Sequence, residues 1–118
     1  MKDNVYPPED CKKHIMSVYD AMDLLGGKWK ISIIATLVYH TERRFSDMLS
    51  DVKGISNKML SKELKDLEMN KIILRTVLDT RPITVVYTLT EYGQELTTVI
   101  QHLADWGVKH RRKIVEEF

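Results

Sequence analysis

One predicted helix carries the side chains with the clearest chemistry, a stripe of cationic and short polar groups at helical spacing: Lys58, Ser61, Lys62 and Lys65. Leu60, Leu64 and Leu67 recur on roughly the opposite face, which predicts that this side of the helix packs on a core. Lysine ammonium groups bind DNA phosphates, whereas amide and hydroxyl side chains can hydrogen-bond to base edges. We therefore expect phosphate contacts from the lysines and base contacts from Asn57 and Ser61.

The elements around this helix favour DNA recognition, although such a stripe by itself is also typical of a solvated surface helix. The pattern predicts a short helix (46–52), a turn (53–55), the basic-faced helix with Ser56 as its N-cap, and two strands (72–78 and 84–89) around a hairpin tip (79–83). This order is that of a winged helix-turn-helix, which presents one helix to the major groove. The expected fold class is mainly α with a small β-hairpin wing (α+β).

Two arginines flank the basic-faced helix. Arg81 lies at the hairpin tip, where an arginine can enter a narrow minor groove or simply serve as a soluble turn residue. Arg44 comes just before the short helix, where it can bind a backbone phosphate or pair with Asp47. We include both arginines in the expected DNA-binding set.

Apolar stripes at both ends of the chain predict a homodimer. The first helix stops at Gly26–Gly27, a buried central helix is expected at 28–39, and a last helical region follows Thr90. A strand is the alternative at 28–39, because many of its residues are β-branched. A second apolar surface is most economically covered by two-fold pairing. The residues expected there are Ile15, Tyr19, Met22, Leu96, Val99, Ile100, Leu103 and Trp106.

Composition limits the class of protein. The chain has 118 residues, 43% apolar and 30% charged, with a formal net charge of +1, so DNA binding must come from local placement of charge. The single Cys11 excludes an intramolecular disulfide and suits a reducing cytosol. No apolar run reaches the ~18 residues of a membrane helix, so we expect a cytoplasmic protein without a membrane partner. The expected organisation is a flexible arm at 1–14 and one domain at 15–118.

Five fragments occur in an order that is familiar: Gly26-Gly27-Lys28-Trp29, Arg44-Phe45-Ser46, Gly54-Ile55-Ser56, Leu60-Ser61-Lys62-Glu63-Leu64 and Tyr87-Thr88-Leu89-Thr90-Glu91-Tyr92-Gly93. Together with Cys11 and Trp106 they resemble the HxlR family of bacterial transcriptional regulators. The resemblance implies a homodimer, joined through its first and last helices, that binds double-stranded operator DNA. Some members carry a cysteine that senses oxidants or electrophiles, and Cys11 stands at its position. Two positions depart from the family pattern, Lys12 in place of proline and Thr84 in place of a basic wing residue.

Other functions remain open alternatives at this point. Basic neighbours of Cys11 favour the thiolate and hence a redox sensor, whereas the alternative is an inert thiol in a mobile arm. A small-molecule or oxidant effector would fit a regulator of this kind. The runner-up function is a winged-helix module that binds a protein and no DNA. We expect no enzyme, cofactor or metal site, because no phosphate loop, carboxylate pair or catalytic triad is recognisable in the sequence.

Overall fold

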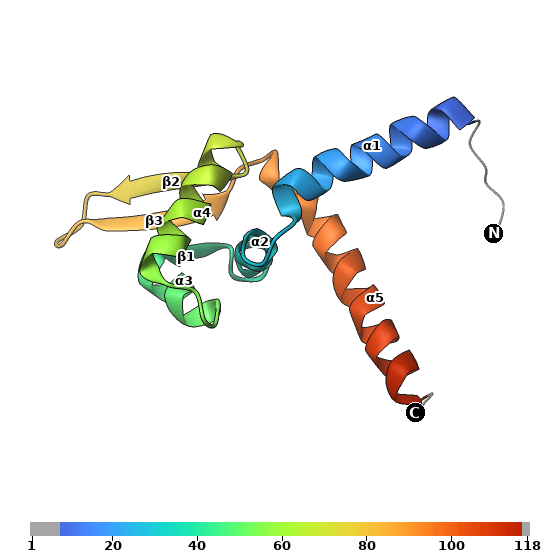
Figure 1. Ribbon diagram of the computed structural model, residues 1–118. Coiled ribbons are helices and arrows are strands. Elements are labelled where there is room, and N and C mark those ends of the chain that lie inside the picture. Colours follow the sequence, from blue (N-terminus) through green and yellow to red (C-terminus); the bar gives the residue numbers. More distant parts are fainter. Residues whose placement is uncertain (1–7, 117–118) are drawn as a thin grey trace.

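The computed structural model describes residues 8–116, which form six helical segments and three strands (Figure 1). In chain order the elements are α1 (Pro8–Leu25), α2 (Lys30–His40), β1 (Glu42–Arg44), α3 (Phe45–Asp51), α4 (Asn57–Met69), β2 (Ile73–Leu78), β3 (Thr84–Leu89), the 3-10 turn η1 (Gly93–Glu95) and α5 (Leu96–Glu116). This is the predicted winged helix-turn-helix: α3 and α4 form the motif, and β2 with β3 forms the wing. None of the helices within residues 8–116 is long and apolar enough to cross a membrane.

Local signals explain where the helices of the motif begin and end. The Ser56 hydroxyl accepts a hydrogen bond from the backbone N–H of Met59 at 3.1 Å, which confirms Ser56 as the N-cap of α4. Gly54 lies in the turn before it with φ +87°, a conformation that costs glycine little. The central segment is helical from Lys30 to His40, which decides against the strand alternative.

The sheet contains a strand that was not predicted. The strand order is β1-β3-β2 and every pairing is antiparallel, with Arg43 opposite Tyr87 and Thr76 opposite Val86. The wing strands lie where the alternation of the sequence places them, although β2 begins at Ile73, one residue later than expected. The short strand β1 ties the residues just before α3 to the base of the wing.

The core lies where α2 packs against α3, α4 and the sheet. Its largest fully buried side chains come from all of these elements: Ile33, Ile34, Leu37, Met48, Leu60, Leu67 and Ile73. Ile100, near the start of α5, joins the same core and is only 5% exposed. Ile100 thus has little exposed surface left for the contact with a second subunit that was expected of it.

Helices α1 and α5 leave this body in different directions (Figure 1). The first helix begins at Pro8, so the expected flexible arm is wrong for residues 8–14, which are helical; residues 1–7 lie outside the described residues. It ends at the predicted glycine pair, where Gly27 has φ +85°. At the other end of the chain α5 continues through Gly107 to Glu116 without a break. Both helices thus extend well beyond the core that anchors them.

Candidate nucleic-acid interface

The polar face of α4 is open to solvent along its length. Asn57, Lys58, Ser61, Lys62 and Lys65 are all exposed, as expected for side chains that reach a groove. The opposite face is held rigidly, since its leucines are almost completely buried: Leu60, Leu64 and Leu67. The structure therefore brings five of the predicted DNA-binding residues together on one exposed helix face.

An ion cluster that sequence reasoning missed joins α2 to α4. The Lys30 ammonium, at the first residue of α2, donates to the Glu63 carboxylate and lies 3.4 Å from Asp66 Oδ2. The hydrogen bond with Glu63 is the main reason that the pKa of Lys30 is raised above its ordinary value. Glu63 is only 8% exposed, so this cation compensates an otherwise buried charge.

Asp66 also contacts the lysine stripe. Its Oδ2 atom lies 3.7 Å from Lys62 Nζ, an i,i+4 pair on α4. Of the two carboxylates in the cluster, only Asp66 therefore contacts a lysine of the predicted DNA-binding stripe. The Lys62–Asp66 pair follows from i,i+4 spacing, whereas no local spacing marks the contacts of Lys30, because these depend on how α2 packs on α4.

Arg44 is the N-cap residue of α3, the first helix of the motif. The Asp47 carboxylate accepts a hydrogen bond from the backbone N–H of Arg44 at 3.0 Å and lies 3.4 Å from its Nε atom. These contacts, the backbone bond first, hold the pKa of Asp47 below its ordinary value. The Arg44 side chain is still 60% exposed, so the pairing with Asp47 leaves its guanidinium open to solvent. Neighbouring Arg43 is committed instead to a two-bond pair with Asp51 at 2.8 Å.

The wing presents Arg81 at its tip. Arg81 is exposed, and the turn that carries it is closed by short contacts of Thr80 Oγ1, 2.6 Å from the carbonyl oxygen of Pro82 and 2.8 Å from Thr84 Oγ1. Thr84, the position where a basic residue was expected from the family pattern, thus serves to hold the turn. A shallow depression of about 370 Å³ is lined by Arg44 as well as by Pro82 and Thr84, so it connects the start of α3 with the wing.

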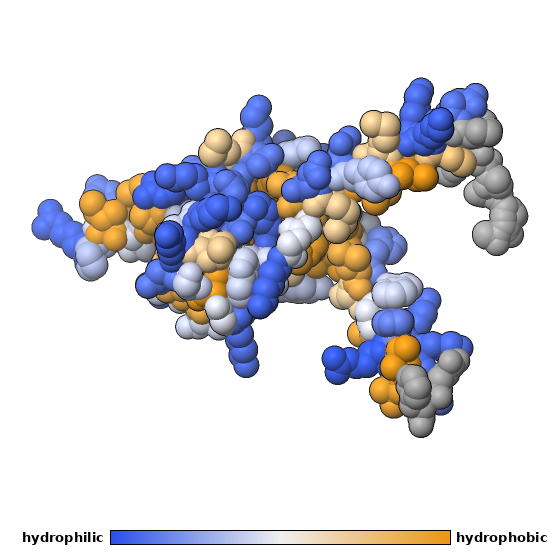
Figure 2. Space-filling model, viewed as in Figure 1, coloured by the Kyte–Doolittle hydropathy of each residue, from blue (hydrophilic) through white to orange (hydrophobic). Residues whose placement is uncertain are grey.

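Apolar side chains that are largely exposed within residues 8–116 lie on α1 and α5. On α1 these include Ile15, Tyr19 and Met22, and on α5 Leu103 is 51% and Trp106 59% exposed. Val99 is exposed as well, whereas Leu96 is half-buried against the core. Figure 2 shows hydrophobic surface along α1 and near the end of α5, away from the mostly hydrophilic surface of the body. We name the exposed apolar residues of these two helices, without Leu96 and Ile100, the paired-helix surface.

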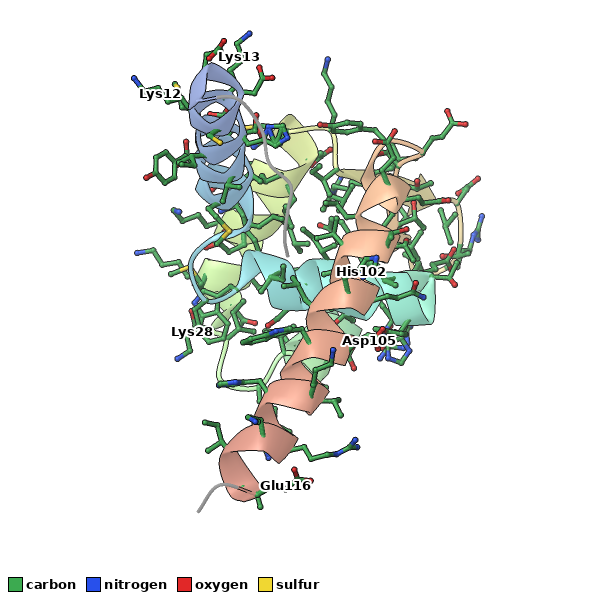
Figure 3. The ribbon with its side chains drawn as sticks, turned by 90° about the vertical axis from the view of Figure 1, so that its right-hand side faces the viewer. Lys12, Lys13, Lys28, His102, Asp105 and Glu116 are labelled. Carbon is green, nitrogen blue, oxygen red and sulfur yellow. The ribbon has the colours of Figure 1, made fainter. Side chains whose placement is uncertain are left out.

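The paired-helix surface extends further than expected. Residues that were not singled out also expose large apolar side chains: Met16, Val18, Val108, Ile114 and Val115. Figure 3 places Lys12 and Lys13 at the free end of α1 and Glu116 at the free end of α5, with His102 and Asp105 between them on α5. The Trp106 ring stacks on His110, with centroids 4.7 Å apart and planes inclined by 9°.

Cys11 lies exposed on α1 and not in a loose arm. One turn later, His14 Nδ1 lies 3.1 Å from the carbonyl oxygen of Asp10 on the same helix. In the part of the chain that the structure describes, no group of three or more His, Cys, Asp or Glu side chains is arranged to hold a metal ion. A thiol on an ordered helix has a defined position relative to the paired-helix surface, which a thiol in a mobile arm would lack.

Known proteins are similar to this chain in sequence and in fold. The HxlR-like helix-turn-helix family matches residues 24–115. The chain is 35% identical over 103 residues to the uncharacterized HTH-type transcriptional regulator YtcD of Bacillus subtilis (strain 168), covering 87% of this chain and 81% of YtcD. It is 42% identical over 87 residues to the HTH-type transcriptional regulator YodB of the same strain, covering 74% and 77% of the two chains. The reduced form of the redox regulator HypR superposes with a TM-score of 0.76 at 29% identity, over 86% of this chain and 99% of HypR. The chain is a member of the HxlR-like helix-turn-helix family of DNA-binding transcriptional regulators.

Proposed function

We propose that this regulator acts in the cytoplasm as a homodimer that places one α4 helix in each half-site of an operator. The exposed polar face of α4 carries this proposal, since its opposite face is buried and two of its three carboxylates, Glu63 and Asp66, contact Lys30. Lys58, Lys62 and Lys65 bind phosphates, whereas Asn57 and Ser61 read base edges. Arg44 adds a phosphate contact, and Arg81 reaches the adjacent minor groove.

The paired-helix surface supports the dimer. Monomeric proteins rarely leave two amphipathic helices uncovered, and a two-fold axis lets the same residues of both copies cover each other. Two HTH subunits then reach half-sites about one helical turn, ~34 Å, apart. A small rotation between the paired helices would change that spacing, which links any effector at this surface to operator binding.

The salt dependence of operator binding tests the assignment of α4. A Lys58→Ala/Lys62→Ala variant removes two lysines from each protomer, so the slope of log affinity against log salt should become shallower by ~3.6 units at ~0.9 per phosphate contact. The matched control is Lys12→Ala/Lys13→Ala, which removes the same charge at the free end of α1 and should leave the slope unchanged (Figure 3). Operators for the measurement come from selection in a random duplex pool. Wild-type affinity and slope in the α4 variant would exclude α4 as the DNA-binding helix.

We further propose that Cys11 is the oxidant- or electrophile-responsive group. Its exposure on α1 supports this role, as does the similarity to HypR, which is described as a redox regulator. A bulky or charged adduct at Cys11 would alter the packing of α1 in the dimer and thereby the half-site spacing. Treatment with diamide or a quinone should lower the operator affinity of the wild type but not of Cys11→Ser. If both proteins respond equally, the effector is sensed elsewhere.

A further inference from the structure

The charges of α4 cancel when the helix is taken alone. Between Asn57 and Met69 the helix has three lysines, Lys58, Lys62 and Lys65, and three carboxylates, Glu63, Asp66 and Glu68. A carboxylate next to a DNA-facing lysine weakens phosphate binding in two ways, because it repels the phosphate and occupies the lysine as a counter-ion. The surplus of positive charge needed for DNA binding must therefore come from outside α4.

Lys30 supplies that charge from α2. It contacts the same Asp66 carboxylate oxygen as Lys62. Asp66 Oδ2 lies 3.4 Å from Lys30 Nζ and 3.7 Å from Lys62 Nζ, so two ammonium groups share one carboxylate oxygen. Their surroundings differ strongly. The Lys30 side chain is 17% exposed, whereas that of Lys62 is 65% exposed.

Glu63 fixes Lys30 in this position. Its carboxylate is nearly buried and accepts a hydrogen bond from Lys30. If Lys30 moved away, the Glu63 carboxylate would be left buried without a counter-ion. Lys62 has no such anchor in its contact with Asp66, and an exposed i,i+4 pair of this kind is weak. Between the two cations, Lys30 is the permanent partner of Asp66 and Lys62 is the exchangeable one.

We propose that Lys30 is a positioning residue for DNA binding: by neutralising Asp66 from α2, it releases Lys62 to bind an operator phosphate. This inference rests on the proposed role of Lys62 as a phosphate contact. Lys30 itself does not touch DNA. Its effect on DNA binding is indirect and is confined to Lys62, the lysine that contacts the same Asp66 carboxylate.

The test compares salt slopes of operator binding in four backgrounds. Lys30→Met/Glu63→Gln removes the buried pair together, so that no unpaired buried charge is left to unfold the protein. In this variant Lys62 is the remaining cation at Asp66, and the slope should become shallower by up to ~1.8 units, as for loss of two Lys62 contacts per dimer. Adding Lys62→Ala should then change the slope no further, and adding Asp66→Asn instead should restore the wild-type slope.

Three single substitutions keep the test decisive even if that variant folds poorly. Lys30→Arg retains the cation and should leave the slope at its wild-type value. Asp66→Asn in the wild-type background should also leave the slope unchanged, since Lys30 already neutralises this carboxylate. A steeper slope in Asp66→Asn, or a wild-type slope in Lys30→Met/Glu63→Gln, would overturn the role of Lys30 alone. A wild-type slope in Lys62→Ala would overturn both this inference and the phosphate contact on which it rests.

Discussion

Replacing Leu103 with glutamate tests the dimer most directly. Half of this side chain is already covered by its own chain, since it is 51% exposed, so a partner subunit removes the other half from water. Fully burying a leucine is worth ~1.5–3 kcal/mol, which leaves about 1 kcal/mol per protomer to the interface. A glutamate there must also take up a proton to be buried uncharged. From an ordinary pKa of ~4.3 this costs about 4 kcal/mol per protomer at pH 7.

The two copies of the substitution add, because a two-fold axis places both in the same interface. The upper limit is therefore about 10 kcal/mol, and even a third of it raises the dissociation constant more than a hundredfold, at ~1.4 kcal/mol per decade. Leu103→Glu should sediment as a monomer at micromolar concentration and should return to a dimer as the pH falls toward ~4, where the carboxyl is neutral. Far-ultraviolet circular dichroism should remain that of a folded protein, because the core residues are untouched.

Gln101→Glu is the matched control on the same helix. Gln101 is exposed and lies two residues before Leu103, about 160° around α5, so its charge lies on the side of the helix opposite Leu103 and away from Trp106. This variant should remain a dimer with wild-type operator affinity. A Leu103→Glu protein that sediments as a dimer beside Gln101→Glu, or a wild-type protein that is monomeric, would refute the two-fold pairing through α5.

Three smaller predictions concern the DNA-binding body. At pH values above the ordinary pKa of an aspartate, the ionised Asp47 carboxylate stabilises the fold, and this contribution is lost as the pH falls through the lowered pKa of the folded protein. Asp47→Asn should therefore remove this part of the pH dependence of the free energy of unfolding, measured by urea unfolding in a pH series. Gly54→Ala should cost about 1–2 kcal/mol of stability in thermal unfolding because of φ +87°, and a Cβ there would lie at an ordinary contact distance of 3.8 Å from the Trp29 ring, so a larger cost would contradict a purely backbone origin. Arg81→Ala should weaken binding to operators with A·T-rich flanks more than to those with G·C-rich flanks, and equal losses on both would contradict a minor-groove role.

How much could be predicted from the sequence depended on how local each signal was. The strand from Thr84 to Leu89 and the N-cap at Ser56 are encoded by neighbouring residues, through alternation and through one hydroxyl, and both were located correctly. The start of α1 also had a local signal, a proline at the first helical position followed by acidic residues, which was overlooked. The position of the helix matters because it moves Cys11 from an arm onto an ordered surface.

Other features could not be read from neighbours in the chain. The strand β1 has three residues and no alternating pattern of its own. It forms because it pairs with β3, with Arg43 opposite Tyr87. The Lys30–Glu63 and Lys30–Asp66 contacts span 33 and 36 residues and require α2 to be docked on α4. Ile100 shares a helical stripe with Leu103, and only the packing of α5 on α2 decides that Ile100 is buried whereas Leu103 remains half exposed.

The separation between the core and the paired-helix surface has an evolutionary consequence. The side chains that hold the DNA-binding body together lie almost entirely between Leu25 and Ile100, whereas the proposed surface for a partner lies on the two helices that extend beyond it. If the proposed dimer forms there, substitutions on α1 or on the far half of α5 would change which subunits pair without altering the operator that α4 is proposed to read. A cell with several regulators of this shape needs such independence, because mixed dimers would combine half-sites from different promoters. Duplicated genes can diverge in partner choice and in operator choice at separate rates.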